Sequence, residues 1–385
     1  MRRFVRILLI IAIALLGVFI FAPPLVENKE NVVLLKPPYH ASQAARDLHK
    51  TLLIADLHAD SLLWKRDLLQ HGNRGEVDVP RLIEGNVALQ AFTVVTKTPF
   101  GLNIERNDDK SDMITLLAIV SLWPPKTWFS LKERALYEAE KLQAFSEKSN
   151  SKFILIKNRT DLTEYLERRK HDPAITAGFL GMEGAHPLDG NIENLNDFYD
   201  AGFRMIAPVH FFDNEIGGSA HGIRKGGLTS LGREMIQMME KKKMIVDLAH
   251  ASPRLIDDAI AIAHRPLLVS HTGIKGTCNN QRNLSDSEVK AIAAGGGIIG
   301  IGYWDTAVCG DNPQSIARAI RYSVQIAGIE HVALGSDFDG AVTVPFDSSG
   351  MILLTEALMK DGFTAEEIRK IMGENAINFL LRNLP

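Results

Sequence analysis

The segment LLIADLHAD, residues 52–60, is an apolar run that ends in polar side chains, as a buried β-strand does where it leaves a sheet. Within it, His58 and Asp60 lie two residues apart, and a β-strand places residues i and i+2 on the same face. The pair can therefore bind one cation at the end of a strand. A loop in which both side chains meet only water is the alternative, and the residues further along the chain decide between the two.

Seven more apolar runs follow the first, and segments with helical spacing separate them. The eight runs span residues 52–58, 87–95, 176–183, 204–210, 244–250, 266–271, 297–303 and 331–337, and a further run at 153–157 is interpreted as part of an insertion. The helical segments span residues 131–148, 192–201, 230–242, 253–263, 285–294, 315–327 and 364–381. Apolar strands that alternate with helices predict a parallel sheet covered on both faces. Eight units in about 340 residues favour an α/β fold of the (β/α)8 TIM-like barrel type over an open doubly wound sheet.

Composition and motifs argue against several other classes of protein. The 385 residues are 46% hydrophobic and 23% charged, with a formal net charge of −3, as in an ordinary globular protein. The chain has no long Lys/Arg block, which argues against a nucleic-acid partner. No G-x-G-x-x-G motif follows the first run, which argues against dinucleotide binding. Cys278 and Cys309 allow at most one intramolecular disulfide, so the fold is not a disulfide scaffold.

The first 26 residues predict a membrane signal. Three arginines among the first six residues precede an apolar run of 16 residues, 7–22, a length between a signal-peptide core and a membrane helix of about 20 residues. Because no clean Ala-x-Ala cleavage site follows, we favour an uncleaved signal anchor with the barrel on the periplasmic or extracellular side. A cleaved signal peptide and a secreted protein are the alternative. Residues 27–42 predict a tether, and residues 43–385 predict the barrel, with an insertion around residues 96–130.

Seven ionisable side chains lie at the ends of six of the eight runs. They are His58, Asp60, Glu183, His210, His250, His271 and Asp337. The carboxyl ends of the strands of a barrel meet on one face, so residues distant in sequence meet around one pocket. Each residue alone could be structural, but randomly placed polar residues would be shared between the two ends of the barrel. The pattern therefore predicts one site.

The ligand types in this set predict two metal ions. Three histidines, one aspartate and one glutamate are one or two ligands too many for a single tetrahedral zinc site. We expect two Zn²⁺ or similar divalent ions, bridged by Glu183, with His58 and Asp60 on one side and His250 and His271 on the other. Two metals about 3.5–4 Å apart lower the pKa of a shared water toward neutrality. Hydrolysis is the natural use of such a site.

Seven short motifs occur in an order that carries a resemblance. They are DLHAD (56–60), VDVPRL (77–82), GMEG (181–184), VDLAH (246–250), SH (270–271), QRN (281–283) and GSDFDG (335–340). From about residue 52 to its end, the chain resembles the membrane (renal) dipeptidase family of two-zinc peptidases. The resemblance implies the same metal ligands, with Glu183 binding both ions, and a possible homodimer. It also implies that His210 contacts the substrate and the tetrahedral intermediate, that Arg282 holds the substrate carboxylate and that Asp337 handles the proton.

These last three roles also have a physical basis in the residues. Arg282 carries a planar, charged fork that suits a carboxylate, although a surface or helix-cap arginine is the alternative. Asp337, in the motif GSDFDG, can take a proton from water and pass it to a leaving amine, and Asp339 is a second candidate for this role. His210 can stabilise a developing oxyanion.

Residues 96–130 depart most from the family pattern and are apolar for an exposed loop. They are interpreted as an insertion that packs on the outside of the barrel, with a lid, a membrane-facing patch and a dimer contact as alternatives.

The expected function is a two-zinc dipeptidase acting on small dipeptides with a free C-terminal carboxylate. One alternative is an amidohydrolase for N-acyl amino acids, lactones or other small amides. The other is a catalytically silent, membrane-tethered barrel, which would lack metal ligands, whereas all five are present in this sequence.

Overall fold

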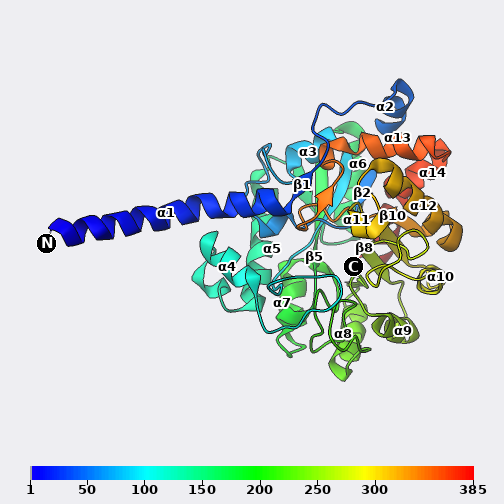
Figure 1. The fold of residues 1–385 in the computed structure, drawn as a ribbon. Helices are drawn as coiled ribbons and strands as arrows, with labels where there is room; N and C mark the ends of the chain where they lie inside the picture. Colours follow the sequence, from blue (N-terminus) through cyan, green and yellow to red (C-terminus); the bar gives the residue numbers. More distant parts are fainter. Residues whose placement is uncertain (1) are drawn as a thin grey trace.

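Eight parallel strands form a closed ring at the centre of the fold (Figure 1). The computed structural model describes residues 2–385, apart from the side chains of residues 2, 5 and 8–15. The ring strands are β2 (Ile54–Asp56), β3 (Val87–Phe92), β5 (Thr176–Met182), β6 (Phe203–Ile206), β7 (Ile245–Val246), β8 (Leu268–Thr272), β9 (Ile298–Ile301) and β10 (Val332–Leu334). Their order is β7-β6-β5-β3-β2-β10-β9-β8. A parallel bridge between Asp247 and Leu268 joins β7 to β8 and closes the ring.

The ring confirms the expected alternation of strands and helices. Every residue of β3 and of β5 is buried, because helices cover the outside of the strands and side chains fill the inside. This burial on both faces is why the ring strands occur in the sequence as continuous apolar runs. The additional run forms β4 (Phe153–Leu155), which pairs with β5 in parallel outside the ring path.

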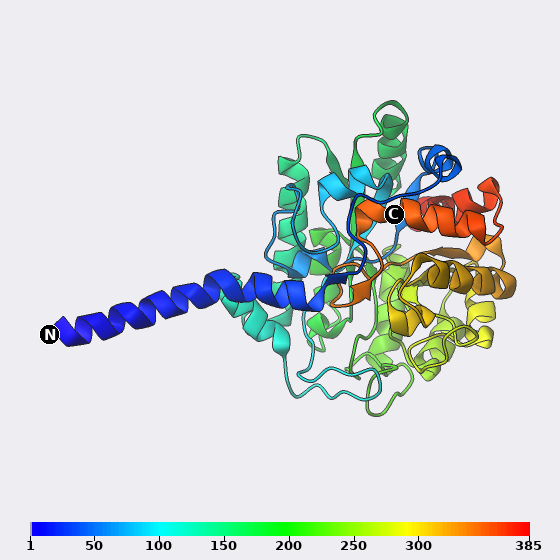
Figure 2. The same ribbon diagram turned by 45° about the horizontal axis from the view of Figure 1, so that its top comes forward.

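Helices cover the outer face of the ring (Figure 2). They include α2 (Gln43–His49), α3 (Val79–Glu84), α5 (Leu131–Lys148), α6 (Arg159–His171), α7 (Asn194–Ala201), α8 (Ser230–Lys241), α9 (Pro253–Ile262), α10 (Asp286–Ala294), α12 (Pro313–Ala327), α13 (Ile352–Lys360), α14 (Ala365–Arg369) and α15 (Asn375–Asn383). Polar N-caps fix where several begin: the side chain of Ser252 accepts from the Leu255 amide at α9, and Ser285 and Glu288 form a capping box at α10.

The expected helix at residues 364–381 is interrupted in the structure. A π-helical turn, Lys370–Glu374, separates α14 from α15. A Cβ atom on Gly373 would lie 1.7 Å from the carbonyl oxygen of Leu53. The glycine therefore lets this turn touch the backbone that leads into β2, and the helix bends around that contact.

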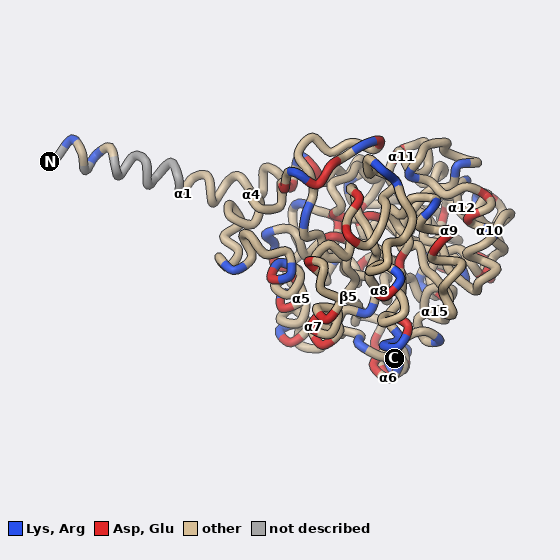
Figure 3. The backbone as a smooth tube through the Cα atoms, turned by 90° about the horizontal axis from the view of Figure 1, so that it is seen from below, with Lys and Arg blue, Asp and Glu red and all other residues tan. Residues whose placement is uncertain are grey.

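Helix α1 (Arg2–Glu30) projects away from the barrel over most of its length and meets the barrel at its C-terminal end (Figure 3). The membrane-anchor prediction rests largely on residues 8–15, whose side chains lie outside the described part of the chain. Among the described residues, none of the helices combines the length and the apolar character that crossing a bilayer requires. The anchor therefore stays a prediction.

The segment expected to be a tether, residues 27–42, packs against the barrel. Glu27, in α1, is 1% exposed and forms ion pairs with Arg66 and with Arg74, the latter at 2.6 Å. Strand β1 (Val32–Val33) pairs in parallel with β11 (Thr343–Val344). The partners of Glu27 lie about forty residues further along the chain, so local composition does not reveal these contacts.

Cys278 and Cys309 form a disulfide with a Cα–Cα separation of 5.2 Å. It joins the loop after β8 to the end of the short helix α11 (Asp305–Val308) after β9. The two half-cystines therefore link neighbouring loops at the carboxyl end of the ring.

A buried histidine makes the stability of the fold depend on pH. His49, in α2, is hydrogen-bonded to Thr355 Oγ1 (2.8 Å) and to the carbonyl oxygen of Gly85 (3.1 Å), and burial lowers its pKa from 6.5 to about 4. The unfolded chain therefore binds this proton at a higher pH than the folded chain does. The contribution of neutral His49 to the free energy of unfolding is therefore complete above pH 6.5. It is lost as the pH falls toward 4, a change of about 3 kcal/mol.

Urea unfolding at pH 7.5 and at pH 4.5 tests this expectation. The fall in the free energy of unfolding between the two pH values should be smaller in His49→Gln than in the wild type by about 2–3 kcal/mol. The control His264→Gln, whose ring is 87% exposed, should lose as much stability as the wild type. An equal loss in His49→Gln and the wild type would show that His49 does not contribute.

Candidate metal centre and active site

All seven ionisable residues expected at the strand ends come together at the carboxyl end of the ring. His58 and Asp60 follow β2, Glu183 follows β5 directly, and Asp337 lies three residues after β10. His271 lies within β8 itself. The clustering of these side chains is what the pattern of strand ends predicted.

Most of the ring strands end one to four residues earlier than the sequence suggests, and the difference is largest for β6 and β7. Strand β6 ends at Ile206 and β7 at Val246, so His210 and His250 lie four residues further on, in loops. Pro208 has no amide hydrogen with which to continue the ladder of β6. After β7, the carboxylate of Asp247 accepts hydrogen bonds from the amides of Ala249 and Ser270 at 3.0 and 2.8 Å. The Asp247 carboxylate thus accepts amide hydrogen bonds that backbone carbonyl groups would accept if the strand continued.

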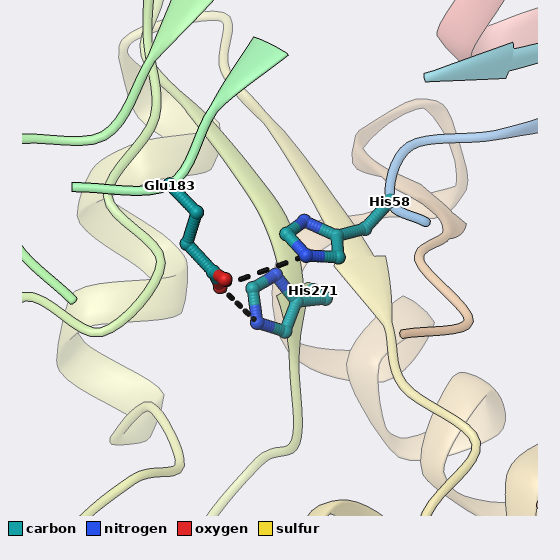
Figure 4. A group of neighbouring side chains, drawn as sticks. All are labelled: His58, Glu183 and His271. Carbon is teal, nitrogen blue, oxygen red and sulfur yellow. Dashed lines mark ion pairs between the residues drawn. The ribbon is translucent and has the colours of Figure 1, made fainter. Parts of the chain in front are cut away.

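The carboxylate of Glu183 lies at the centre of the cluster. Its Oε1 is 2.9 Å from His250 Nε2, 3.3 Å from His271 Nε2 and 3.6 Å from His58 Nε2. Its Oε2 is 3.1 Å from His210 Nε2. Figure 4 shows Glu183 with His58 and His271. The two imidazole groups approach the Glu183 carboxylate from the side facing it. One carboxylate thus contacts four histidines.

The remaining contacts extend the cluster on the side of His58. Its Nε2 is 3.4 Å from Asp60 Oδ1 and 3.8 Å from Asp337 Oδ1. Burial by itself would lower the pKa of His58, but the neighbouring carboxylates of Asp60, Glu183 and Asp337 outweigh it and raise the pKa to about 10. Three carboxylates around one imidazole nitrogen stabilise a positive charge at this point.

The donor atoms fit a divalent cation. Burial lowers the pKa values of His210, His250 and His271 well below the usual histidine value, which keeps these rings neutral with a lone pair available. His250 Nε2 and His271 Nε2 lie 2.9 Å apart. Within the described part of the chain, His58 Nε2 and Glu183 Oε1 are buried and have no hydrogen-bond partner. Neutral nitrogens and carboxylate oxygens directed at one volume are the ligands that Zn²⁺ prefers.

Three overlapping sets of ligand atoms could each hold an ion, with the atoms of each set within 4.8 Å of one another. The sets are His58 with Glu183 and His271, Glu183 with His210 and His250, and His58 with Asp60 and Asp337. Glu183 and His58 each belong to two sets. The overlap at Glu183 accords with the expected bridging carboxylate. The overlap at His58 was not expected, and it arises because the imidazole ring of His58 lies between Asp60 and Glu183.

Hydroxyl groups behind the cluster orient its ligands. Ser270 Oγ lies 3.2 Å from His58 Nδ1 and 2.9 Å from His271 Nδ1. Thr93 Oγ1 donates to Asp60 Oδ1 at 2.6 Å. Hydrogen bonds of this kind direct the opposite ring nitrogen, or the free carboxylate oxygen, toward a metal. Sequence reasoning did not single out Thr93, and it quoted Ser270 only as the neighbour of His271 in the motif SH, because hydroxyl residues are common in buried strands.

The backbone is held in the left-handed region at two site residues. His250 has a φ of 62° and Asp337 a φ of 63°, conformations that cost non-glycine residues about 1–3 kcal/mol each. A Cβ atom on Gly340 would lie 2.2 Å from Asp337 Oδ1, so this glycine leaves room for the carboxylate.

Burial raises the pKa of Asp337 to about 7, although His58 opposes the shift. A carboxyl group that titrates near neutrality is suited to proton transfer.

Asp339, the second candidate for proton transfer, is occupied elsewhere. Its carboxylate accepts hydrogen bonds from the amide of Glu76 at 2.7 Å, from Ser61 Oγ at 2.5 Å and from Arg66 Nη2 at 2.5 Å. These contacts join the loop after β10 to the segment between β2 and α3. The geometry therefore favours Asp337 over Asp339.

Arg282 lies on the loop after β8 and is only 5% exposed. Its Nη2 donates to the carbonyl oxygen of His271 at 2.8 Å and its Nη1 to Thr272 Oγ1 at 3.4 Å. Its Cζ lies 5.7 Å from the ring centre of Trp304. Burial lowers the pKa of Arg282, but a guanidinium keeps its charge in proteins, so a buried cation stands beside the acidic cluster.

A cavity of about 410 Å³ joins these residues, because Asp60, Glu183, His210, His250, Arg282 and Asp337 all line it. Sequence reasoning missed His221 and Trp304, which also line the cavity. His221 Nδ1 lies 2.6 Å from the carbonyl oxygen of Ile104, and burial lowers its pKa to about 3. The glycine-rich stretch GGSAHG, residues 217–222, could have drawn attention to His221. It was missed because it lies in a loop and not at the end of a strand.

The insertion, residues 96–130, forms helix α4 (Met113–Val120) and a short 3-10 helix, Pro125–Thr127. Ile114 and Leu117 of α4 line the cavity. The interpretation that the insertion packs on the outside of the barrel is therefore wrong for these residues. Helix α4 lies over the carboxyl end of the ring, because its apolar residues pack on Leu63 and Val95, which follow β2 and β3.

Comparison with known proteins agrees with the geometry of the site. The sequence model of the membrane dipeptidase family, peptidase family M19, matches residues 42–382. An uncharacterised protein in the pqqA 5′ region of Klebsiella pneumoniae is 31% identical over 231 residues, which cover 56% of this chain and 84% of that protein. An uncharacterised dipeptidase of Schizosaccharomyces pombe is 30% identical over 214 residues, which cover 51% of each chain.

The fold is shared with a solved structure as well. The crystal structure of a metallopeptidase from Rhodobacter sphaeroides, with a phosphinate mimic of the dipeptide L-Ala-D-Ala bound, is 22% identical to this chain, with a TM-score of 0.68. The match covers 86% of this chain and 99% of that chain. Because the family model spans nearly the whole barrel, the chain belongs to the membrane dipeptidase family, M19, and is a metal-dependent peptidase.

Proposed function

We propose that the protein is a two-zinc dipeptidase that hydrolyses small dipeptides with a free C-terminal carboxylate. The observation that carries the proposal is the cavity that places the buried guanidinium of Arg282 beside the cluster centred on Glu183. A guanidinium fork binds a carboxylate through two parallel hydrogen bonds. The Rhodobacter sphaeroides metallopeptidase was solved with a dipeptide mimic, which supports the same class of substrate here.

The ligands of the proposed metal centre are His58, Asp60, Glu183, His250 and His271. Two bound zinc ions would polarise the scissile carbonyl and supply a hydroxide at neutral pH. Glu183 is the residue suited to bridging the ions, because its two carboxylate oxygens contact histidines on both sides. The overlap of the ligand sets at Glu183 supports a site for two ions that share one carboxylate.

The other site residues act on the substrate itself. Arg282 holds the C-terminal carboxylate and so fixes the distance to the scissile bond. Asp337 takes the proton of the attacking water on its carboxylate and delivers it to the nitrogen of the leaving amine. His210 lies 3.1 Å from Glu183 Oε2, at a position from which its ring can stabilise the oxyanion of the tetrahedral intermediate.

The N-terminal segment places the enzyme at a membrane in this proposal. Residues 1–26 act as a signal anchor, and the catalytic domain faces the periplasm or the extracellular space. The disulfide between Cys278 and Cys309 supports this location, because disulfides persist mainly in oxidising compartments. N-terminal sequencing of the protein from the membrane fraction should begin at Met1 if the anchor is retained. The homodimer implied by the family resemblance stays a prediction.

Removal of the guanidinium tests the proposed substrate class. In Arg282→Ala, we expect kcat/KM for dipeptides with a free carboxylate to fall on the order of 100-fold, because two charge-assisted hydrogen bonds are lost. The rate on C-terminally amidated dipeptides should change little, so the variant loses its preference for the free acid. Steady-state kinetics on paired acid and amide substrates measures both effects.

The control is Arg318→Ala, which removes an exposed arginine on α12 and should leave both rates unchanged. If Arg282→Ala cleaves the free acid as fast as the wild type, the carboxylate-binding role is wrong. Faster cleavage of N-acyl amino acids or lactones than of any dipeptide would favour an amidohydrolase instead.

A further inference from the structure

The cavity has an apolar wall in addition to its ionisable residues. Six apolar side chains that line it are Val26, Leu63, Val95, Met113, Ile114 and Leu117. Pockets of about 300–1,000 Å³ that bind small molecules combine a few placed polar groups with an apolar lining. The apolar wall contains no metal ligand and no proton-transfer group, so it is available to contact the part of a substrate that lies away from the metal centre.

The apolar wall lies across the ring from Arg282. Leu63 and Val95 follow β2 and β3, whereas Arg282 follows β8. The eight strands close with β8 next to β7, so β2 and β3 lie opposite β7 and β8 in the ring order. Glu183 follows β5, and its carboxylate reaches the histidines of β7 and β8. The acidic cluster therefore lies between the guanidinium and the apolar wall.

Four of the six wall residues form a packed unit before any substrate binds. Leu63, Val95, Ile114 and Leu117 belong to an apolar cluster that also contains Trp123 and is separate from the two clusters of the barrel core. The exposed fractions of Ile114 and Leu117 are 2% and 8%. A buried apolar surface with fixed neighbours presents a defined shape to a ligand.

A buried arginine holds the insertion in place. Arg134, on α5, is 1% exposed, and its Nη1 donates to the carbonyl oxygen of Thr96 at 2.7 Å and to Asp112 Oδ2 at 2.6 Å. The other oxygen of Asp112 accepts from the amide of Ile114 and caps α4. Both ends of the segment that precedes α4 are thus attached to one side chain of the barrel.

Helix α1 completes the wall. Val26 and Glu30 line the cavity, and Glu27 between them is fixed by its ion pairs with Arg66 and Arg74. The N-terminal helix is therefore part of the substrate cavity as well as the proposed membrane anchor.

We propose that this apolar wall is the subsite for the N-terminal residue of the substrate and that it selects a bulky apolar side chain there. The inference rests on the proposed dipeptidase function. With the C-terminal carboxylate on Arg282 and the scissile carbonyl at the Glu183 cluster, the first residue of a dipeptide extends across the ring, toward Leu63 and α4. A leucyl or phenylalanyl side chain fills this wall with apolar contact, whereas a glycyl residue leaves it empty and an aspartyl residue buries an unpaired charge.

A dipeptide panel on the metal-loaded full chain tests the selection. We expect kcat/KM for leucyl-alanine and phenylalanyl-alanine to exceed that for glycyl-alanine by about 10- to 100-fold, the discrimination available from burying one large apolar side chain. Aspartyl-alanine should be the poorest of the four. Equal rates on glycyl-alanine and leucyl-alanine would overturn the inference.

Matched variants on α4 locate the subsite. Met113 lines the cavity and is 39% exposed, whereas Leu116 on the same helix is 54% exposed and is not among the lining residues. Met113→Asp should lower kcat/KM for leucyl-alanine at least about 10-fold and raise it for lysyl-alanine, because the new carboxylate can pair with the lysyl ammonium. Leu116→Asp should leave the panel unchanged. Both positions are exposed enough to tolerate the substitution without loss of the fold.

The outcomes distinguish the inference from the function on which it rests. If the full chain with bound metal cleaves no dipeptide of the panel, the proposed dipeptidase function fails. If dipeptides are cleaved without preference at the first residue, or if Met113→Asp and Leu116→Asp behave alike, the dipeptidase function stands and the apolar subsite is rejected.

Discussion

Replacement of Glu183 by glutamine is expected to lower kcat for dipeptide hydrolysis by on the order of 10³-fold or more and to leave fewer than two metal ions per chain. The carboxylate lies within 2.9–3.6 Å of a nitrogen of His58, His210, His250 and His271. An amide of the same shape offers one neutral oxygen in place of two charged ones. It cannot bridge two cations with comparable strength, so at least one ion should be lost or bound weakly.

Metal analysis of the purified variant, together with steady-state kinetics, measures both effects. The control is Glu193→Gln, which changes an exposed glutamate beyond the same strand and should keep two ions and full activity. A Glu183→Gln protein with both ions and wild-type kcat would show that Glu183 does not bridge them.

Replacement of Asp337 by asparagine is expected to lower kcat on the order of 10³-fold while KM changes little. The asparagine keeps the size of the side chain and the contact with Gly340 but cannot accept and release a proton. Because Asp337 acts after the substrate is bound in this account, its loss affects the chemical step and spares binding. A circular-dichroism melt of the variant checks that the fold is retained at this left-handed position, where asparagine is tolerated.

Asp305→Asn is the matched control, because Asp305 is an exposed acid beside the cavity residue Trp304. It should leave both kinetic parameters unchanged. If Asp337→Asn raises KM and spares kcat, the residue binds substrate and another group transfers the proton.

The sequence carried enough information to place the ring strands and the site at their ends. Apolar runs marked each ring strand because strands covered on both faces exclude polar residues. His58, Glu183 and His271 could then be assigned to one site, since parallel strands deliver their carboxyl ends to one face. The pattern could not show that His58 belongs to two ligand sets, because this depends on ring orientations set by Ser270.

The walls of the cavity were harder to predict from the sequence. The interpretation of residues 96–130 as an outer packing segment was wrong for α4, because an apolar helix is equally suited to the outside of a barrel and to the rim of a pocket. The contact that decides between them is a hydrogen bond from Arg134 to Thr96, 38 residues apart. The burial of Glu27 depends in the same way on Arg66 and Arg74. Long-range pairs of this kind leave no periodic signal in a single sequence.

Metal content and dipeptide hydrolysis, measured on the same preparation, test whether the protein is a two-metal dipeptidase. The full chain, purified without chelators, should contain two divalent ions per chain and cleave dipeptides with a free carboxylate. Chelator treatment should abolish the activity, and added Zn²⁺ should restore it as the content returns to two ions. If the protein binds less than one ion per chain, or cleaves the same dipeptides at an undiminished rate after its metal is removed, it is not a two-metal dipeptidase.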